Sequence, residues 1–185
     1  LRELIEQAIA AHRDRPCFTC MDRTLTYGDV DVLAGRFAAY LQQVARLRKG
    51  DRIALMLPNV LQYPVAILGA FRAGLTIVNT NPMYTPRELQ HQLHDSGARA
   101  ILILENFAHT LAEVQHDVHL DTVIVTGVGD LLAFPKSMLV NFVLRHVKKQ
   151  VPEYSLPGAV SMTEALSKGR YETLERVELG HEDIA

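Results

Sequence analysis

Two cysteines at a spacing of three are the first residues whose types could do chemistry. Cys17-Phe18-Thr19-Cys20 has the C-x-x-C pattern that redox pairs and zinc sites use. A redox pair needs a helix N-terminus to lower a thiol pKa, and a zinc site needs a second pair of ligands. The sequence instead predicts a strand here, where positions three apart face opposite sides. We therefore interpret both cysteines as packing residues.

Histidines also recur at a spacing of three, as His91 with His94 and as His116 with His119. A helix would place each pair on one face, as some metal sites require. The first pair lacks cysteine or glutamate partners at a suitable spacing, and on a helix Asp117 would diverge from its neighbour His116. We therefore interpret both pairs as solvated helix surface and predict no metal site.

A glycine pair, Gly127-Val128-Gly129, follows an expected strand, as in dinucleotide-binding loops. Leu132 stands where that pattern needs its third glycine, so we interpret the pair as a turn. The chain also lacks the phosphate-loop pattern G-x-x-x-x-G-K-S/T, the G-x-S-x-G elbow and the H-E-x-x-H motif. The motifs therefore predict no self-contained active site.

Basic and apolar residues are interleaved between Leu131 and Val151, and no acidic residue occurs between Asp130 and Glu153. A basic amphipathic helix can lie in a membrane interface, where apolar burial adds to attraction for anionic lipid. Amphipathic helices more often cover their own protein, and both alternatives stay open. The residues that would contact a membrane are Lys136, Phe142, Arg145, Lys148 and Lys149.

Composition limits the class of protein. The 185 residues are 48% hydrophobic and 22% charged, which predicts a packed core. A net charge of −2 argues against nucleic acid as a partner. Two cysteines cannot form a disulfide framework, so we expect a reducing, cytoplasmic location, with peripheral contact on the inner membrane as the alternative. We see no leader after Leu1 and no stretch approaching the ~20 apolar residues of a spanning helix.

Short apolar strands alternate with helices through the middle of the chain. Strands are expected at 52–57, 75–78, 100–104 and 122–125, and helices at 60–73, 86–96 and 108–118. This alternation predicts an α/β fold, a layered domain with a mostly parallel sheet flanked by helices.

Three regions follow from this pattern. Region 1–48 holds an N-terminal helix, a strand pair around a Met21-Asp22 turn, and a long amphipathic helix. Region 49–130 is the parallel-sheet core. Region 131–185 combines the basic segment with a linker and a short helix at 161–167.

The string FRAGLTIVNTNPMYTPREL at 71–89 contains residues that mark the end of one helix, a turn and the start of the next helix. Gly74 can supply the left-handed residue that ends a helix. Asn81-Pro82 cannot continue a helix. Thr85 can cap the next helix, with Glu88 reaching back as a capping box.

This string resembles a core motif of the adenylate-forming enzymes, the acyl-CoA synthetase group. Leu25-Thr26-Tyr27, Lys49-Gly50-Asp51-Arg52 and Asp95-Ser96-Gly97-Ala98 resemble further motifs of that family. The matching positions are mostly scaffold positions of the family: Thr26, Tyr27, Gly50, Asp51, Gly74, Asn81, Pro82, Tyr84, Thr85 and Glu88.

Within the family, residues 55–68, 106–111 and 140–157 resemble the bacterial long-chain fatty acid–CoA ligases. The resemblance implies that ATP and a fatty acid give an acyl-adenylate, from which CoA then displaces AMP, with Mg²⁺ neutralising the phosphates. The family's phosphate loop, its ribose-binding acidic residue and its C-terminal lysine have no counterpart in this sequence, and 181–185 resembles the approach to the phosphate loop.

The resemblance therefore implies that this chain is the N-terminal part of a ligase. It also implies that this part alone is inactive. No catalytic, cofactor or metal residue carries over, and ATP, Mg²⁺ and CoA are expected to bind the full-length enzyme rather than this part. A ligase for another carboxylic acid and a non-catalytic α/β binding or membrane-docking module are the alternatives. A homodimer is left open.

Overall fold

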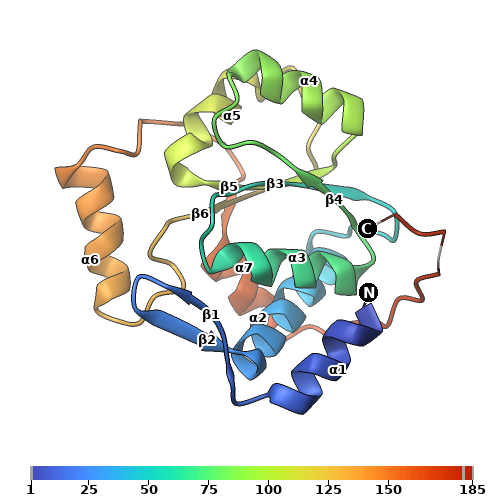
Figure 1. Cartoon of the computed structure of the whole chain (residues 1–185). Coiled ribbons are helices and arrows are strands. Elements are labelled where there is room, and N and C mark those ends of the chain that lie inside the picture. Colours follow the sequence, from blue (N-terminus) through green and yellow to red (C-terminus); the bar gives the residue numbers. More distant parts are fainter. Residues whose placement is uncertain (1, 181, 185) are drawn as a thin grey trace.

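The computed structural model describes residues 2–180 and 182–184, with side chains described from residue 4 onward. Its main sheet has five parallel strands in the order β4-β3-β5-β6-β7 (Figure 1). The strands are β3 (Arg52–Met56), β4 (Thr76–Asn79), β5 (Ala100–Leu104), β6 (Thr122–Thr126) and β7 (Val160–Ser161). The predicted α/β fold with a parallel sheet is therefore confirmed.

Helices cover both faces of this sheet (Figure 1). On one face lie α2 (Tyr27–Ala39), α3 (Gln62–Ala73) and α7 (Met162–Gly169). On the other face lie α4 (Pro86–Ser96) and α5 (Ala108–Val114). The layers explain why the strands are apolar throughout, since both of their faces are buried.

Side-chain alternation along the strands divides the core into two clusters. In β3, Ile53 and Leu55 join the larger cluster with α2, α3 and α7, whereas Ala54 and Met56 join the smaller cluster with α4 and α5. In β5 the same alternation sends Leu102 to the larger cluster and its neighbours to the smaller one. All three sequence regions contribute to the larger cluster, and the division of the chain into those regions stays a prediction.

The N-terminal part contributes Ile9 and Leu25 to the larger cluster. Helix α1 (Arg2–His12) leads into the hairpin of β1 (Pro16–Cys20) and β2 (Arg23–Thr26). Its turn places Met21 and Asp22 at φ of 47° and 61°, as the predicted strand pair requires.

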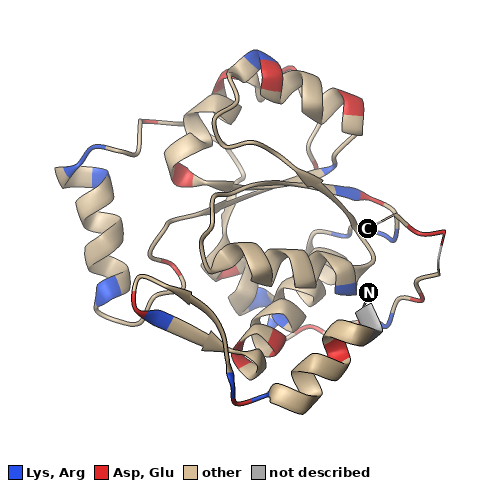
Figure 2. Cartoon of the chain, in the orientation of Figure 1, with Lys and Arg blue, Asp and Glu red and all other residues tan. Residues whose placement is uncertain are grey.

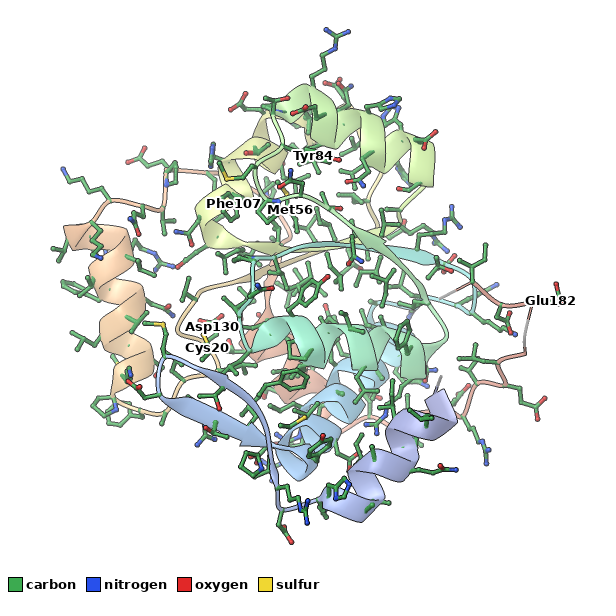
Figure 3. All side chains as sticks on the ribbon, in the orientation of Figure 1. Cys20, Met56, Tyr84, Phe107, Asp130 and Glu182 are labelled. Atoms are coloured by element: carbon green, nitrogen blue, oxygen red, sulfur yellow. The ribbon has the colours of Figure 1, made fainter. Side chains whose placement is uncertain are left out.

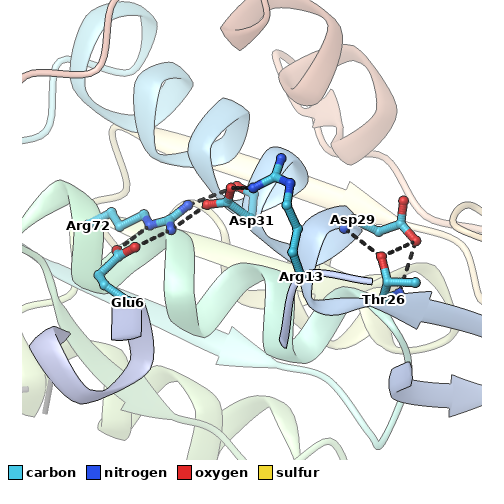
Figure 4. Close-up of polar contacts among 6 residues, drawn as sticks. All are labelled: Glu6, Arg13, Thr26, Asp29, Asp31 and Arg72. Atoms are coloured by element: carbon cyan, nitrogen blue, oxygen red, sulfur yellow. Dashed lines mark hydrogen bonds and ion pairs between the residues drawn. The ribbon is translucent and has the colours of Figure 1, made fainter. Parts of the chain in front are cut away.

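A buried arginine joins the first three helices (Figure 4). Arg72 on α3 binds both carboxylate oxygens of Glu6 on α1, at 2.9 and 2.8 Å, and Asp31 on α2 at 2.7 Å. Burial disfavours the charged guanidinium, but the two carboxylates outweigh it and raise the pKa of Arg72. The helices therefore meet through a paired charge rather than through apolar contact alone.

Several boundaries differ from those expected. A 3₁₀ turn (Glu105–Phe107) precedes α5, which ends at Val114 rather than Val118, because the chain turns there toward β6 and packs a partly buried Val118 against the smaller cluster. Strand β7 was missed, since two residues carry no periodicity. Helices α2 and α6 (Lys136–Phe142) each continue into a π-helical turn, at Tyr40–Val44 and Val143–Val147.

Candidate functional site

The 71–89 motif begins with a helix stop. Gly74 ends α3 in the left-handed conformation, at φ 78° and ψ 23°. A Cβ at this position would lie 2.7 Å from Val177 Cγ1, so glycine is needed for both conformation and space. The predicted role of Gly74 is confirmed.

The turn after β4 aims one aromatic side chain into the core. Asn81 Oδ1 accepts a hydrogen bond from the Met83 N–H at 3.0 Å, and the Tyr84 N–H donates to Asn81 O at 3.1 Å. Tyr84 is partly buried and packs against the smaller cluster, which contains Met56; both residues are labelled in Figure 3. The Asn81-Pro82 turn thus positions Tyr84 under α4.

Two capping boxes start α2 and α4, and the one at α4 is the box predicted for Thr85 and Glu88. Thr85 Oγ1 accepts from the Glu88 N–H at 3.4 Å, and Glu88 Oε2 accepts from the Thr85 N–H at 2.8 Å. The hydrogen bonds that the Thr85 N–H and hydroxyl donate to the Glu88 carboxylate lower the pKa of Glu88. Thr26 and Asp29 make the same reciprocal pair before α2, at 3.1 and 2.9 Å (Figure 4).

Two further scaffold positions, Gly50 and Asp51, lie at the amino end of the sheet, where the Gly50 N–H donates to Gly74 O at 2.9 Å. Gly50, at φ 84°, and Asp51 precede β3, where Asp51 Oδ2 accepts from the Arg48 N–H at 2.8 Å and from Arg99 Nη1 at 2.9 Å. Tyr27 packs against the larger cluster. The structure thus places the ten positions in turns, caps and core contacts on both edges of the sheet, and does not bring them together in one site.

A cavity of about 350 Å³ lies at the carboxyl ends of β5 and β6. In open α/β sheets this edge is where ligands bind. Glu105 directly follows β5 and is 2% exposed; its Oε2 is paired with Arg145 Nη2. No sequence motif pointed to Glu105, although an acidic residue immediately after the apolar strand AILIL was a usable signal.

The loop after β6 forms one wall of this cavity. Asp130 accepts from the Gly127 N–H at 2.8 Å, from Thr126 Oγ1 at 2.9 Å and from Asn141 Nδ2 at 2.9 Å. These bonds hold the glycine pair as a turn, which confirms that interpretation.

The basic segment forms a helix that lies beside the sheet. Lys136 Nζ donates to Met21 O at 2.6 Å and pairs with Asp22 at 2.9 Å, which lowers the pKa of Asp22. Figure 2 shows basic residues at both ends of the helix that α6 and its π-helical turn form together, and no acidic residue on it. Within the part of the chain that the structure describes, the side chains of Lys148 and Lys149 have no ion pair or hydrogen bond.

Helix α6 buries none of its residues, although Val140 packs partly on the larger cluster. The segment exposes large apolar side chains: Phe134, Met138, Leu139, Phe142 and Val147. Among residues 2–180 and 182–184, no helix combines the length and the apolar character that crossing a membrane requires.

The cysteines are packing residues, as interpreted, but their geometry differs from expectation. Both side chains pack against the larger cluster instead of facing opposite sides. The ladder register shifts between Pro16 and Phe18, and such an irregularity breaks strict alternation. Burial raises the pKa of Cys17, although a hydrogen bond with Tyr27 opposes this, so the thiol is a poor nucleophile at neutral pH.

The four histidines are exposed, but only one pair lies on a helix. His91 and His94 lie on α4, and His94 Nε2 is 2.6 Å from Asp117 O. His116 and His119 follow the end of α5, so the helix expected there is wrong for them. Within the described residues, no group of three or more His, Cys, Asp or Glu side chains could hold a metal ion.

Known proteins resemble this chain in both sequence and structure. A family model described as AMP-binding enzyme matches residues 5–177. The chain is 49% identical over 183 residues to a long-chain-fatty-acid–CoA ligase of Haemophilus influenzae, covering 99% of this chain and 33% of that protein. A relative of the same name from Escherichia coli O157:H7 is 49% identical over 185 residues, covering 100% of this chain and 33% of that protein.

A crystal structure of a benzoate CoA ligase from Burkholderia xenovorans LB400 superposes with a TM-score of 0.74 at 20% identity, covering 98% of this chain and 31% of that one. At that identity the likeness establishes the fold alone. The chain spans about a third of the length of the curated relatives it matches. Because the family model covers well over half of the chain, this protein belongs to the AMP-binding enzyme family.

Proposed function

We propose that this chain is the N-terminal part of an ATP-dependent long-chain fatty acid–CoA ligase. Such an enzyme converts a fatty acid, ATP and CoA into acyl-CoA, AMP and pyrophosphate through an acyl-adenylate. The observation that carries the proposal is the 49% identity across 99% of this chain to a ligase of that name. The family match over residues 5–177 supports the adenylate-forming step.

The described residues serve this function as a scaffold. Adenylate chemistry needs backbone amides that cradle anions and a cation near the transferring centre. The ten scaffold positions lie in caps, turns and core contacts, and no catalytic or nucleotide-binding motif of the sequence falls on them. We therefore assign the binding of ATP, Mg²⁺ and CoA to the rest of the full-length protein and to no residue of this chain.

The test is fatty-acid-dependent AMP formation by the full-length product of this gene, with ATP, Mg²⁺, CoA and acids from acetate to oleate. Turnover that rises toward long chains is the expected result. Turnover confined to short or aromatic acids would favour the ligase for another carboxylic acid. No turnover with any acid would favour the non-catalytic binding module.

Sedimentation velocity of the same preparation tests the homodimer, which stays a prediction.

The same assay distinguishes the whole protein from this part. The 185-residue chain produced alone is expected to form no acyl-adenylate, because its sequence carries no phosphate-loop motif. Circular dichroism provides the control that the isolated chain is folded. Adenylate production by a clean, folded preparation would contradict the scaffold role.

We further propose that the basic segment makes peripheral contact with a membrane containing anionic lipid. The support is an acid-free helix that buries no residue, exposes Phe142 and carries two unpaired lysines, Lys148 and Lys149, near its end. Lys136 and Arg145 bind carboxylates of their own chain, so they contribute less to lipid contact.

Vesicle sedimentation of the full-length protein tests this contact. The double variant Lys148→Gln/Lys149→Gln should sediment less than wild type with phosphatidylglycerol vesicles and equally with phosphatidylcholine vesicles. Lys168→Gln is the matched control, because Lys168 is paired with Glu164 at 2.7 Å on α7. Equal sedimentation of the wild type and the double variant with phosphatidylglycerol vesicles would contradict the membrane proposal.

A further inference from the structure

Helix α6 and its π-helical turn are held to the protein by polar side chains along their length. At the start, Lys136 Nζ donates to the backbone of the β1–β2 turn at 2.6 Å. In the middle, Asn141 Oδ1 accepts from the Gly129 N–H at 2.7 Å. In the π-helical turn, Arg145 pairs with the buried carboxylate that follows β5. This arrangement reverses that of an ordinary surface helix, which turns an apolar stripe toward the core and polar residues toward solvent.

Large apolar side chains of the same helix face away from the protein. Met138, Leu139 and Phe142 are 67%, 61% and 57% exposed, and their spacing of three and four residues places them together on one face. We call these three residues the outer face of α6. Phe134, just before the helix, is 79% exposed and extends the apolar surface. Figure 1 shows α6 at the left margin of the molecule, where this face is open to a partner.

The charges beside the outer face indicate lipid as that partner. No acidic residue occurs between Asp130 and Glu153, so nothing in the segment repels a phosphate headgroup. Lys148 and Lys149 follow the apolar residues, and their side chains have no ion pair with any residue that the structure describes. Lysine is depleted at interfaces between proteins, whereas helices that lie in a membrane interface are rich in it. Its apolar stem can also lie along the acyl region while its ammonium reaches the headgroups.

We propose that the outer face of α6 inserts between the lipids of an anionic membrane, with the helix lying parallel to the surface. This inference rests on the membrane contact proposed above and adds to it, because surface attraction through Lys148 and Lys149 requires no apolar burial. The polar contacts of Lys136, Asn141 and Arg145 hold the outer face away from the protein before lipid is met. Insertion therefore needs no refolding of the segment.

Vesicle sedimentation of the full-length protein at two salt concentrations separates insertion from surface attraction. The vesicles contain phosphatidylglycerol, and the higher concentration is about 1 M NaCl, where the screening length falls to about 3 Å. The variant Leu139→Gln/Phe142→Gln should bind at least about tenfold more weakly than wild type at both concentrations, because it loses apolar burial. The variant Lys148→Gln/Lys149→Gln should bind more weakly only at low salt.

The variant Leu4→Gln/Met83→Gln is the matched control. It also removes two exposed apolar side chains, which are 70% and 78% exposed but lie on α1 and in the turn before α4. This control should bind the vesicles as wild type does at both salt concentrations. A loss as large as that of Leu139→Gln/Phe142→Gln would mean that apolar contact is not specific to α6, which would overturn the proposal.

The remaining outcomes distinguish this inference from the proposals on which it rests. Equal binding of wild type and Leu139→Gln/Phe142→Gln would overturn insertion, while a lysine effect at low salt would still support the charge contact. No binding by wild type would overturn both. The assay follows no turnover, so its result is independent of the ligase activity.

Two further measurements on Leu139→Gln/Phe142→Gln test the other possible occupants of the outer face. A thermal midpoint well below that of wild type would mean that another part of the full-length protein covers the face. Conversion of a wild-type dimer into a monomer in sedimentation velocity would mean that a second copy covers it. Either result would overturn insertion, which predicts that neither the midpoint nor the oligomeric state falls.

Discussion

Thr26 and Thr85 show how much a local rule can predict. Each hydroxyl accepts a hydrogen bond from the backbone N–H of an acidic residue three positions later. The carboxylate of that acidic residue accepts one from the threonine N–H. Both pairs were predictable because capping depends on residues within one turn. The scaffold role of these positions is therefore visible in sequence, whereas contacts between distant residues are not.

Thr85→Ala removes the cap of α4. The expected loss is about 0.5–2 kcal/mol of unfolding free energy, because the Glu88 N–H loses its acceptor. Urea denaturation measures it. Thr85→Ser keeps the hydroxyl and should stay close to wild type. An unchanged midpoint for Thr85→Ala would show that the cap contributes nothing.

Glu88 makes part of the stability dependent on pH. Hydrogen bonds from Thr85 lower the pKa of Glu88 in the folded state. Its contribution is therefore present above the ordinary glutamate pKa and is lost as pH falls through the lower folded value. Wild type should exceed Glu88→Gln in urea midpoint at neutral pH, and the gap should close across that window. A gap that is constant with pH would contradict this assignment.

At the scale of elements, the close approach of α2 and α7 depends on Gly169. Alanine usually stabilises a helix by about 1 kcal/mol relative to glycine. Here its Cβ would overlap the backbone carbonyl of Arg36, which cannot move aside as a side chain could. The overlap dominates, so Gly169→Ala should destabilise the fold by at least about 2 kcal/mol.

Gly158→Ala is the matched control for that change. No atom lies within 4 Å of a Cβ at Gly158, so only its φ of 79° opposes the substitution. Its expected cost is about 1 kcal/mol. Thermal denaturation of both variants compares the two effects, and a Gly169→Ala variant at least as stable as wild type would contradict the packing of α7 on α2.

The elements that sequence predicted well are those with a strong periodic pattern. Helix α4 and strand β5 have the predicted bounds because a cap, a left-handed glycine and a continuous apolar run mark them. Strand β7 was missed because its two residues pair with β6 only after the chain has folded. The shared packing of Cys17 and Cys20 was also missed, since a register shift is invisible in the pattern.

At the scale of the whole molecule, the candidate site escaped prediction for the same reason. Glu105 and Arg145 are 40 positions apart, and their pairing depends on how the basic segment returns to β5. The pattern identified Arg145 as basic surface, but it did not show that a buried carboxylate would meet it. Tertiary contact, rather than residue type, creates the cavity.

Arg72 provides the test of how the three N-terminal helices hold together. Arg72→Met keeps the apolar stem but leaves Glu6 and Asp31 without their shared cation. Both carboxylates are partly exposed and can reach water, so the expected loss is about 1–3 kcal/mol, below the cost of breaking a fully buried pair. Hydrogen exchange should accelerate most in α1, which the pair with Glu6 holds against α3.

Arg13→Met is the matched control, because Arg13 pairs with the same Asp31 at 3.1 Å but has a side chain that is 56% exposed. A surface pair of this kind contributes less than about 1 kcal/mol. The two arginines therefore differ mainly in burial, and urea denaturation of both variants compares them directly. Equal losses would mean that burial of Arg72 adds nothing, and an unchanged exchange rate in α1 would show that apolar packing alone holds that helix.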